Sequence, residues 1–157
     1  MSNIPLTADV VIIGCSIAYH LTKLGTEDLP AEAGLAFTCA WDKPGGFIGR
    51  DIAIRQFGSD NRPNKRLLHF KLCDSNELLL HEEPVWVDGG AVGLITPGRL
   101  GHRIEASLGM GYVQLDEPVT TELLRHTRFE VGVGDRRVSA EARMGAWYDP
   151  ANERIKN

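Results

Sequence analysis

Hydrophobic positions in the C-terminal half of the chain recur every second residue. Leu68, Phe70 and Leu72 alternate with residues of the opposite face in the segment 66–72, as in a strand with one face in a core. Further short runs of this kind occupy 85–87, 91–96, 107–113, 129–133 and 138–142. Short strands separated by turns predict an antiparallel barrel or sandwich from Arg66 to Arg143.

Turn residues link these runs into hairpins. Asp88-Gly89-Gly90 accepts positive φ angles and separates 85–87 from 91–96, which favours a hairpin. The clearest hairpin joins 129–133 to 138–142 through Gly134-Asp135. In it, alternate residues of both strands, Phe129 to Val133 and Val138 to Ala142, are expected on one side of the sheet.

The N-terminal segment has a different pattern. Val10–Ile13 is a β-branched run typical of a buried parallel strand, and Gly14 closes it. Residues 16–24 place Ile17, Leu21 and Leu24 on one helical face. Strand, glycine and helix together resemble the opening of a doubly wound nucleotide-binding unit.

Between these regions the pattern is mixed. Residues 26–34 form a polar linker with a proline, 35–41 are expected to be extended, 43–46 form a tight turn, and 47–57 a short helix. Turn-forming residues fill 58–64. The expected fold is mainly β with α/β elements, in three parts: an isolated β-α unit at 1–25, a short α/β segment at 26–62 and an antiparallel barrel at 63–157.

Charge and cysteine content narrow the function classes. Lysine and arginine number 17 against 21 aspartate and glutamate, giving a net charge of −4, which argues against a nucleic-acid or anionic-membrane partner. An odd number of cysteines, Cys15, Cys39 and Cys73, suits a reducing compartment, and we expect buried thiols. Without a run of roughly twenty apolar residues or a basic leader, the expected location is cytoplasmic.

Two kinds of site are unfavoured. A dinucleotide site needs glycines at G-x-G-x-x-G spacing, but only Gly14 precedes Cys15, so Gly14 is at most vestigial. His81-Glu82-Glu83 and His102-x-x-Glu105 match no metal-ligand spacing and are expected to be solvated charge. No catalytic residue and no metal ligand is therefore predicted.

The C-terminal region keeps two alternatives open. Its basic residues either form a charge-paired sheet face or gather into an anion site; they are Arg125, Arg128, Arg136, Arg137 and Arg143. Trp147 and Tyr148 stand together before a turn. Such aromatics either cap a core or stack on a flat heterocyclic ligand.

Several ordered motifs resemble a known family. The stretch LPAEAGLAFTCAWDKPGGFIGRDIAIRQ (29–56) is similar to the folate-dependent aminomethyltransferases, the T-proteins of glycine cleavage. RLLHFKL, EPVWVDGGAVGLITPG, GHRIEASLGMGYV and RFEVGVGDRRVSAEA follow in the order of that family's C-terminal barrel. The amino-acid sequence of these motifs resembles most that of the fused dimethylglycine and sarcosine dehydrogenases, in which a flavin domain precedes the folate part.

The same resemblance suggests that segments are missing. The family opening resembles VVIIGGGIVGCSIAYHLTKLG, whereas this chain has VVIIGCSIAYHLTKLG, so the phosphate-binding glycines are absent. After Gly25 the chain continues almost at once into the late folate part. We therefore expect a truncated protein that lacks most of the flavin domain and the front half of the folate domain, including its folate-positioning carboxylate.

The resemblance implies a function for the whole enzyme. It implies oxidative demethylation with one-carbon transfer to tetrahydrofolate, while FAD is not expected to bind here and the isolated chain is expected to be inactive. The alternative is a non-catalytic folate-binding or scaffold barrel acting with a partner chain that supplies the missing segments. Trp147 and Tyr148 are the candidate folate-side aromatics. Pro97 and Leu100 depart from the Ser and Tyr usual in relatives, which weakens the case for folate binding.

Overall fold

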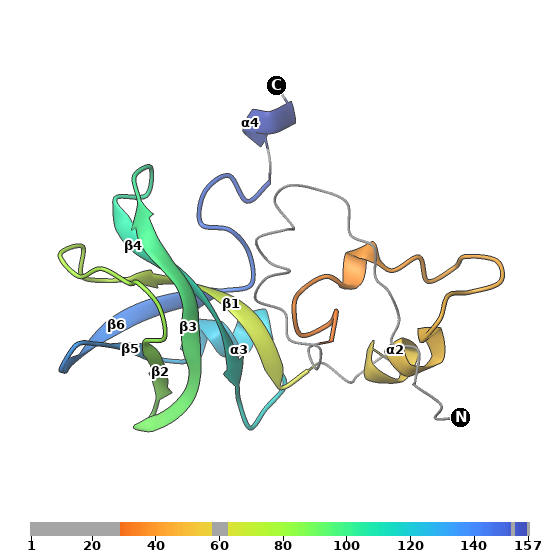
Figure 1. Cartoon of the computed structure of the whole chain (residues 1–157), viewed down its shortest axis with the longest axis horizontal. Helices are drawn as coiled ribbons and strands as arrows, with labels where there is room; N and C mark the ends of the chain where they lie inside the picture. Colours follow the sequence, from red (N-terminus) through yellow and green to blue (C-terminus); the bar gives the residue numbers. More distant parts are fainter. Residues whose placement is uncertain (1–28, 58–62, 152, 157) are drawn as a thin grey trace, which may run out of the picture. The chain divides into compact units, whose positions relative to one another are not determined.

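A computed structural model describes residues 29–57, 63–151 and 153–156. The chain divides into two compact units, Met1–Asn61 and Arg62–Asn157. Six antiparallel strands of the second unit form a closed barrel (Figure 1). The two-residue period allowed a barrel or a sandwich, and the structure shows a barrel.

Around the barrel, strands that are neighbours in space are not always neighbours in sequence. The strands are β1 (Lys65–Leu72), β2 (Pro84–Val87), β3 (Gly90–Gly101), β4 (Ala106–Gln114), β5 (Phe129–Val133) and β6 (Arg136–Arg143). They follow one another in the order β1-β4-β3-β2-β5-β6. Pairing of β6 with β1, from His69 opposite Arg143 to Leu72 opposite Ala140, closes the ring and leaves no open sheet edge.

Both predicted hairpins are confirmed. Asp88 and Gly89 have φ angles of 48° and 83° between β2 and β3, and Val87 pairs with Gly90. Gly134 has a φ angle of 61° between β5 and β6. Left-handed backbone in both turns matches the right-handed twist of the flanking strands, which is why these turn residues could be recognised in the sequence.

The core lies inside the barrel, on the strand face that the alternation predicts. Leu68 and Phe70 are 0% exposed and Leu72 is 2% exposed. Phe70 meets Phe129 of β5 edge to face, with ring centroids 5.6 Å apart, a favoured aromatic geometry. The buried face of β1 thus packs against β5, which lies much further along the sequence.

A short helix that the sequence reading did not predict completes the core. In α3 (Thr121–His126), Thr120 caps the N-terminus by accepting a hydrogen bond from the Leu123 N–H at 3.1 Å. Leu124 is buried, and α3 contacts β6. Six residues give less than two helical turns, which is too short for a helical period to be recognised.

The described residues of the N-terminal unit, 29–57, include two short helical elements. The extended segment expected at 35–41 is wrong, because η1 (Ala36–Thr38) is a 3₁₀ turn held by hydrogen bonds from the Thr38 N–H and hydroxyl to the Leu35 carbonyl. The predicted short helix is confirmed as α2 (Arg50–Phe57). The expected strand at 10–13, helix at 16–24 and Gly14 lie outside the described residues.

Candidate functional site

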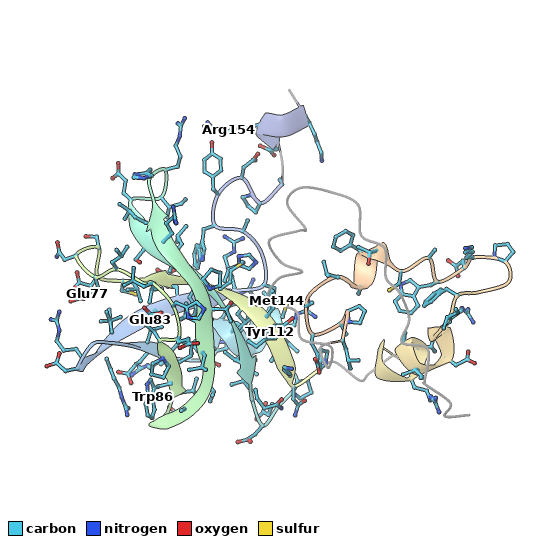
Figure 2. All side chains as sticks on the ribbon, in the orientation of Figure 1. Glu77, Glu83, Trp86, Tyr112, Met144 and Arg154 are labelled. Atoms are coloured by element: carbon cyan, nitrogen blue, oxygen red, sulfur yellow. The ribbon has the colours of Figure 1, made fainter. Side chains whose placement is uncertain are left out.

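The segment after β6 carries the two candidate aromatics. It leads from Met144, labelled in Figure 2, to the C-terminal α4 (Glu153–Lys156). Trp147 is partly buried and Tyr148 is 42% exposed. The structure therefore places the two neighbours in different surroundings, and each is described separately.

Trp147 lies between two basic side chains of the barrel. Its ring centroid is 4.8 Å from Lys71 Nζ of β1 and 5.1 Å from Arg143 Cζ of β6, both within cation–π range. Lys71 also forms an ion pair of 2.8 Å with Glu141. The indole is thus attached to the β1–β6 seam that closes the barrel.

The indole nitrogen of Trp147 is the notable polar atom of this segment. Nε1 is buried and has no hydrogen-bond partner among the residues that the structure describes. A buried donor without an acceptor costs about 1–3 kcal/mol. A hydrogen-bond acceptor brought to Nε1 would relieve this cost.

Tyr148 belongs to the α4 end of the segment. Its ring centroid is 5.5 Å from the guanidinium carbon of Arg154, which Figure 2 labels. Asp149 follows, and its carboxylate accepts the backbone N–H groups of Glu153 at 2.9 Å and Arg154 at 3.1 Å. Asp149 therefore positions α4, and Tyr148 presents its ring toward solvent beside it.

The C-terminal basic residues are mostly paired with carboxylates. Arg136 pairs with Glu77, and Arg137 lies 3.9 Å from Glu130. Arg137 also stacks 3.8 Å over the Trp86 ring. Arg125 pairs with Glu122 at 3.2 Å. Three of the five basic residues are therefore charge-paired, as the first alternative predicts.

One arginine of the barrel is perturbed by burial. Arg66 on β1 is half-buried, and this desolvation lowers the pKa of its guanidinium, while the charge interaction with Tyr112 acts in the opposite direction. Tyr112, labelled in Figure 2, is the register partner of Leu67 in the β1–β4 pairing.

The residues of the two candidate metal motifs lie just before β2 and in the turn between β3 and β4. Glu83 Oε1 accepts the backbone N–H groups of Leu80 at 2.7 Å and His81 at 3.2 Å, which shapes the approach to β2. Glu105 has a φ angle of 55° in the turn between β3 and β4. Within the described ranges, no group of three or more metal-ligating side chains occurs.

The expectation of buried thiols is wrong for the two cysteines that can be placed. Cys73 is exposed and Cys39 is only partly buried. Cys73 directly follows β1, where the strand leaves the barrel and its backbone N–H still bonds to the Ser139 carbonyl at 2.9 Å. Cys15 and Gly14 lie outside the described residues.

The two departures from the family pattern lie on β3. The register of β3 against β4 shifts between Ile95 and Gly98, so Pro97 occupies an irregular point where a missing N–H is tolerated. Leu100 is 41% exposed. Neither residue has a described contact with Trp147 or Tyr148.

The sequence reading missed the cations that hold Trp147. Lys71 is far from both Arg143 and Trp147 along the chain, and the β1–β6 register brings it to the same indole as Arg143. The alternating pattern of β1 gave the one available signal, because it predicted that Lys71 points away from the core.

Comparison with known proteins agrees with the barrel. A family model described as the glycine cleavage T-protein C-terminal barrel domain matches residues 65–149. The aminomethyltransferase T of the glycine cleavage system from Bartonella henselae has the same fold, with a TM-score of 0.58 and 14% identity over 75% of this chain and 31% of that one. The chain therefore belongs to the family of glycine cleavage T-protein C-terminal barrel domains.

Relatives of two kinds contain this region. The chain is 32% identical to a 4-methylaminobutanoate oxidase (formaldehyde-forming) from Paenarthrobacter nicotinovorans and 29% identical to human mitochondrial sarcosine dehydrogenase, over 85% of its length in each case. It is 24% identical to an aminomethyltransferase from Listeria monocytogenes over 91% of its length. It spans only 15%, 14% and 37% of these relatives, respectively.

No helix in the part of the chain described by the structure is long and apolar enough to cross a membrane.

Proposed function

We propose that this chain is the C-terminal barrel part of a flavin- and tetrahydrofolate-dependent enzyme that oxidatively demethylates dimethylglycine or sarcosine, and that the chain is catalytically inert by itself. The observation that carries the proposal is the family match over the barrel. It is supported by the similarity to an oxidase that forms formaldehyde and to a sarcosine dehydrogenase. Similarity to aminomethyltransferases supports the folate part.

Inertness follows from what the resemblance assigns to other segments. The chain spans 15% or less of the N-methyl oxidising relatives. The carboxylate that positions the folate amine has no counterpart in this sequence, and the glycine-rich loop is reduced to Gly14. When bound, tetrahydrofolate supplies the amine that takes up the one-carbon unit. In the whole enzyme this barrel would contribute one side of the site for that cofactor, and the segments supplied by the rest of the enzyme would complete it.

A second candidate, a non-catalytic folate-binding module, is favoured by Trp147. Its buried Nε1–H has no acceptor in the described part of the chain. Of the two cations over this indole, Lys71 is paired with Glu141, and Arg143 is the one that could meet a carboxylate of a ligand. Tyr148, being 42% exposed, offers a ring face that a pterin can approach.

The proposal includes a partner chain that supplies the flavin and front folate segments. Large apolar side chains of the N-terminal unit are exposed, Phe37 by 79% and Ile48 by 69%. Exposed side chains of this kind are typical of protein contacts when they occur together. The proposal also places the chain in the cytoplasm, on the ground of its odd number of cysteines.

Calorimetric titration with tetrahydrofolate separates the two candidates. Saturable micromolar binding would support the folate-binding module. The absence of binding heat would support the first candidate, in which the isolated chain is an inactive part of a larger enzyme. Flavin absorbance in the purified chain, or turnover of sarcosine, would contradict inertness.

The role of the indole nitrogen is tested by Trp147→Phe, which keeps an aromatic ring but removes the N–H. If Nε1 donates to folate, the affinity falls about fivefold, the factor that about 1 kcal/mol gives. Trp86→Phe is the matched control, because Trp86 also lies beside an arginine but on β2. Equal losses in the two variants would contradict a role for Trp147.

A further inference from the structure

The N-terminal unit contains a hollow that the barrel function does not use. The turn at Lys43–Gly46 and the first turns of α2 border an open hollow of about 690 Å³. Its lining includes Lys43, Phe47, Arg50, Asp51 and Arg55. This volume is within the range of small-molecule sites, about 300–1,000 Å³.

The lining is positively charged in a chain that is negatively charged overall. Lys43, Arg50 and Arg55 face one carboxylate, Asp51, so the lining has two more positive than negative charges. The whole chain carries −4. Positive charge concentrated in a concave surface attracts anions more strongly than the same charge spread over a flat one.

The two arginines of the hollow donate hydrogen bonds to backbone carbonyl groups, which are neutral. Arg50 donates from Nε and Nη2 to the Trp41 carbonyl, at 3.1 and 3.0 Å. Arg55 Nε donates to the Asp51 carbonyl at 3.2 Å. Lys43 is exposed and has no ion pair with any residue that the structure describes. Carbonyl oxygens fix the guanidinium groups without neutralising their charge.

The backbone around the hollow favours an anion as well. Gly45, Gly46 and Gly49 have φ angles of 84°, 67° and 82°, so the chain turns sharply with no side chain over the opening. A Cβ at Gly46 would come within 3.2 Å of Arg50 Cδ. The opening turn of α2 follows, and the N–H groups of such a turn lack intrahelical acceptors.

We propose that this hollow binds the phosphate group of a small phosphate monoester. A phosphate monoester carries about −1.5 to −2 at pH 7, which matches the two excess positive charges, whereas a carboxylate would balance only one. Arginine presents a fork of donors to phosphate oxygens and lysine adds a point charge. The residues of this site all belong to the N-terminal unit.

The test is an NMR titration of the full chain with inorganic phosphate, with glycerol 3-phosphate and, as the monoanion control, with acetate at matched ionic strength. We expect saturable shifts of the Gly45, Gly46 and Gly49 amides with both phosphates, weakened by added salt, and little change with acetate. A response to inorganic phosphate but not to the ester would mean that the hollow excludes an organic group, and it would overturn the monoester assignment. Equal responses to acetate would overturn the phosphate assignment.

Charge-neutralising variants locate the site. Lys43→Gln and Arg55→Gln should each weaken phosphate binding about fivefold, whereas Arg103→Gln removes the same charge from the exposed β3–β4 turn and should leave it unchanged. Because Lys43 has no described partner, its replacement should leave the fold intact, and unchanged amide shifts elsewhere would establish this. Unaltered binding in Lys43→Gln, or equal losses in all three variants, would overturn the proposal.

Discussion

At Gly98 the barrel leaves no room for a side chain. A Cβ there would come within 2.5 Å of Leu79 C and Leu79 Cβ, and Leu79 is fully buried. The Gly98 N–H also bonds to the Leu80 carbonyl at 2.8 Å. This close approach fastens the segment before β2 onto β3, next to the register shift at Pro97.

Gly98→Ala should therefore lower the free energy of unfolding by about 1–3 kcal/mol, because the added methyl group must displace backbone atoms. Chemical denaturation followed by circular dichroism measures the change. Gly145→Ala is the control, since a Cβ at Gly145 has no atom within 4 Å, and its effect should stay within about 0.5 kcal/mol. Equal stability of the two variants would show that Leu79 can move away.

The cysteines show why single residues were hard to predict. Residue type alone favours burial of a thiol, and Cys73 directly follows Leu72, which is 2% exposed. One position further along, the chain has left the barrel and Cys73 is exposed. Burial at a strand end depends on where the neighbouring strands stop, which no local pattern encodes.

Among the elements, the hairpins were predictable and α3 was not. Gly89 and Gly134 can be recognised because positive φ angles restrict the residue type. In α3 the stabilising interactions include a threonine cap and the packing of Leu124, and six residues are too few to show a helical period. The η1 turn is also too short to be recognised from a pattern, because its hydrogen bonds join residues only three apart.

The exposed face of α3 should respond to pH. The pKa of Glu122 is lowered, first by its hydrogen bond with His126 and then by the charge of Arg125; the two contacts measure 3.0 and 3.2 Å. A lowered folded-state pKa adds stability above the unfolded pKa, and this is lost as the pH falls through the folded value. Acidification should therefore loosen α3 before the barrel core.

His126→Ala should raise the pKa of Glu122 toward its ordinary value, and Arg125→Ala should raise it less, because the contact with His126 is the larger cause. Carbon-detected NMR titration of the carboxyl group measures both shifts. Arg128→Ala, an exposed neighbour beyond the helix, should cause none. A larger shift in Arg125→Ala than in His126→Ala would reverse the assigned order.

At the scale of the whole molecule, the barrel has its own core. Every residue of the main hydrophobic cluster lies between Leu68 and Ala140, inside the unit Arg62–Asn157. All six strands pair within that unit. A closed ring with a complete core needs no further segment to cover its edges.

The fragment 62–157 should therefore fold alone. We expect a β-type circular dichroism spectrum and a single cooperative thermal transition. Its midpoint should match the barrel transition of the full chain. A fragment that lacks cooperativity, or one that unfolds far below the full chain, would show that residues 1–61 stabilise the barrel.

The sequence by itself determined the strands of the barrel, their inward faces and their tight turns, because alternation and left-handed turn residues act over a few neighbours. Its motifs also identified the family, which the barrel match confirms. Only the tertiary structure decided that the sheet closes, that Lys71 and Arg143 meet at Trp147, and that three cations surround one hollow beside α2. The barrel contacts depend on strand register, which joins residues far apart in the sequence, and the hollow depends on the path of the backbone through the turn before α2.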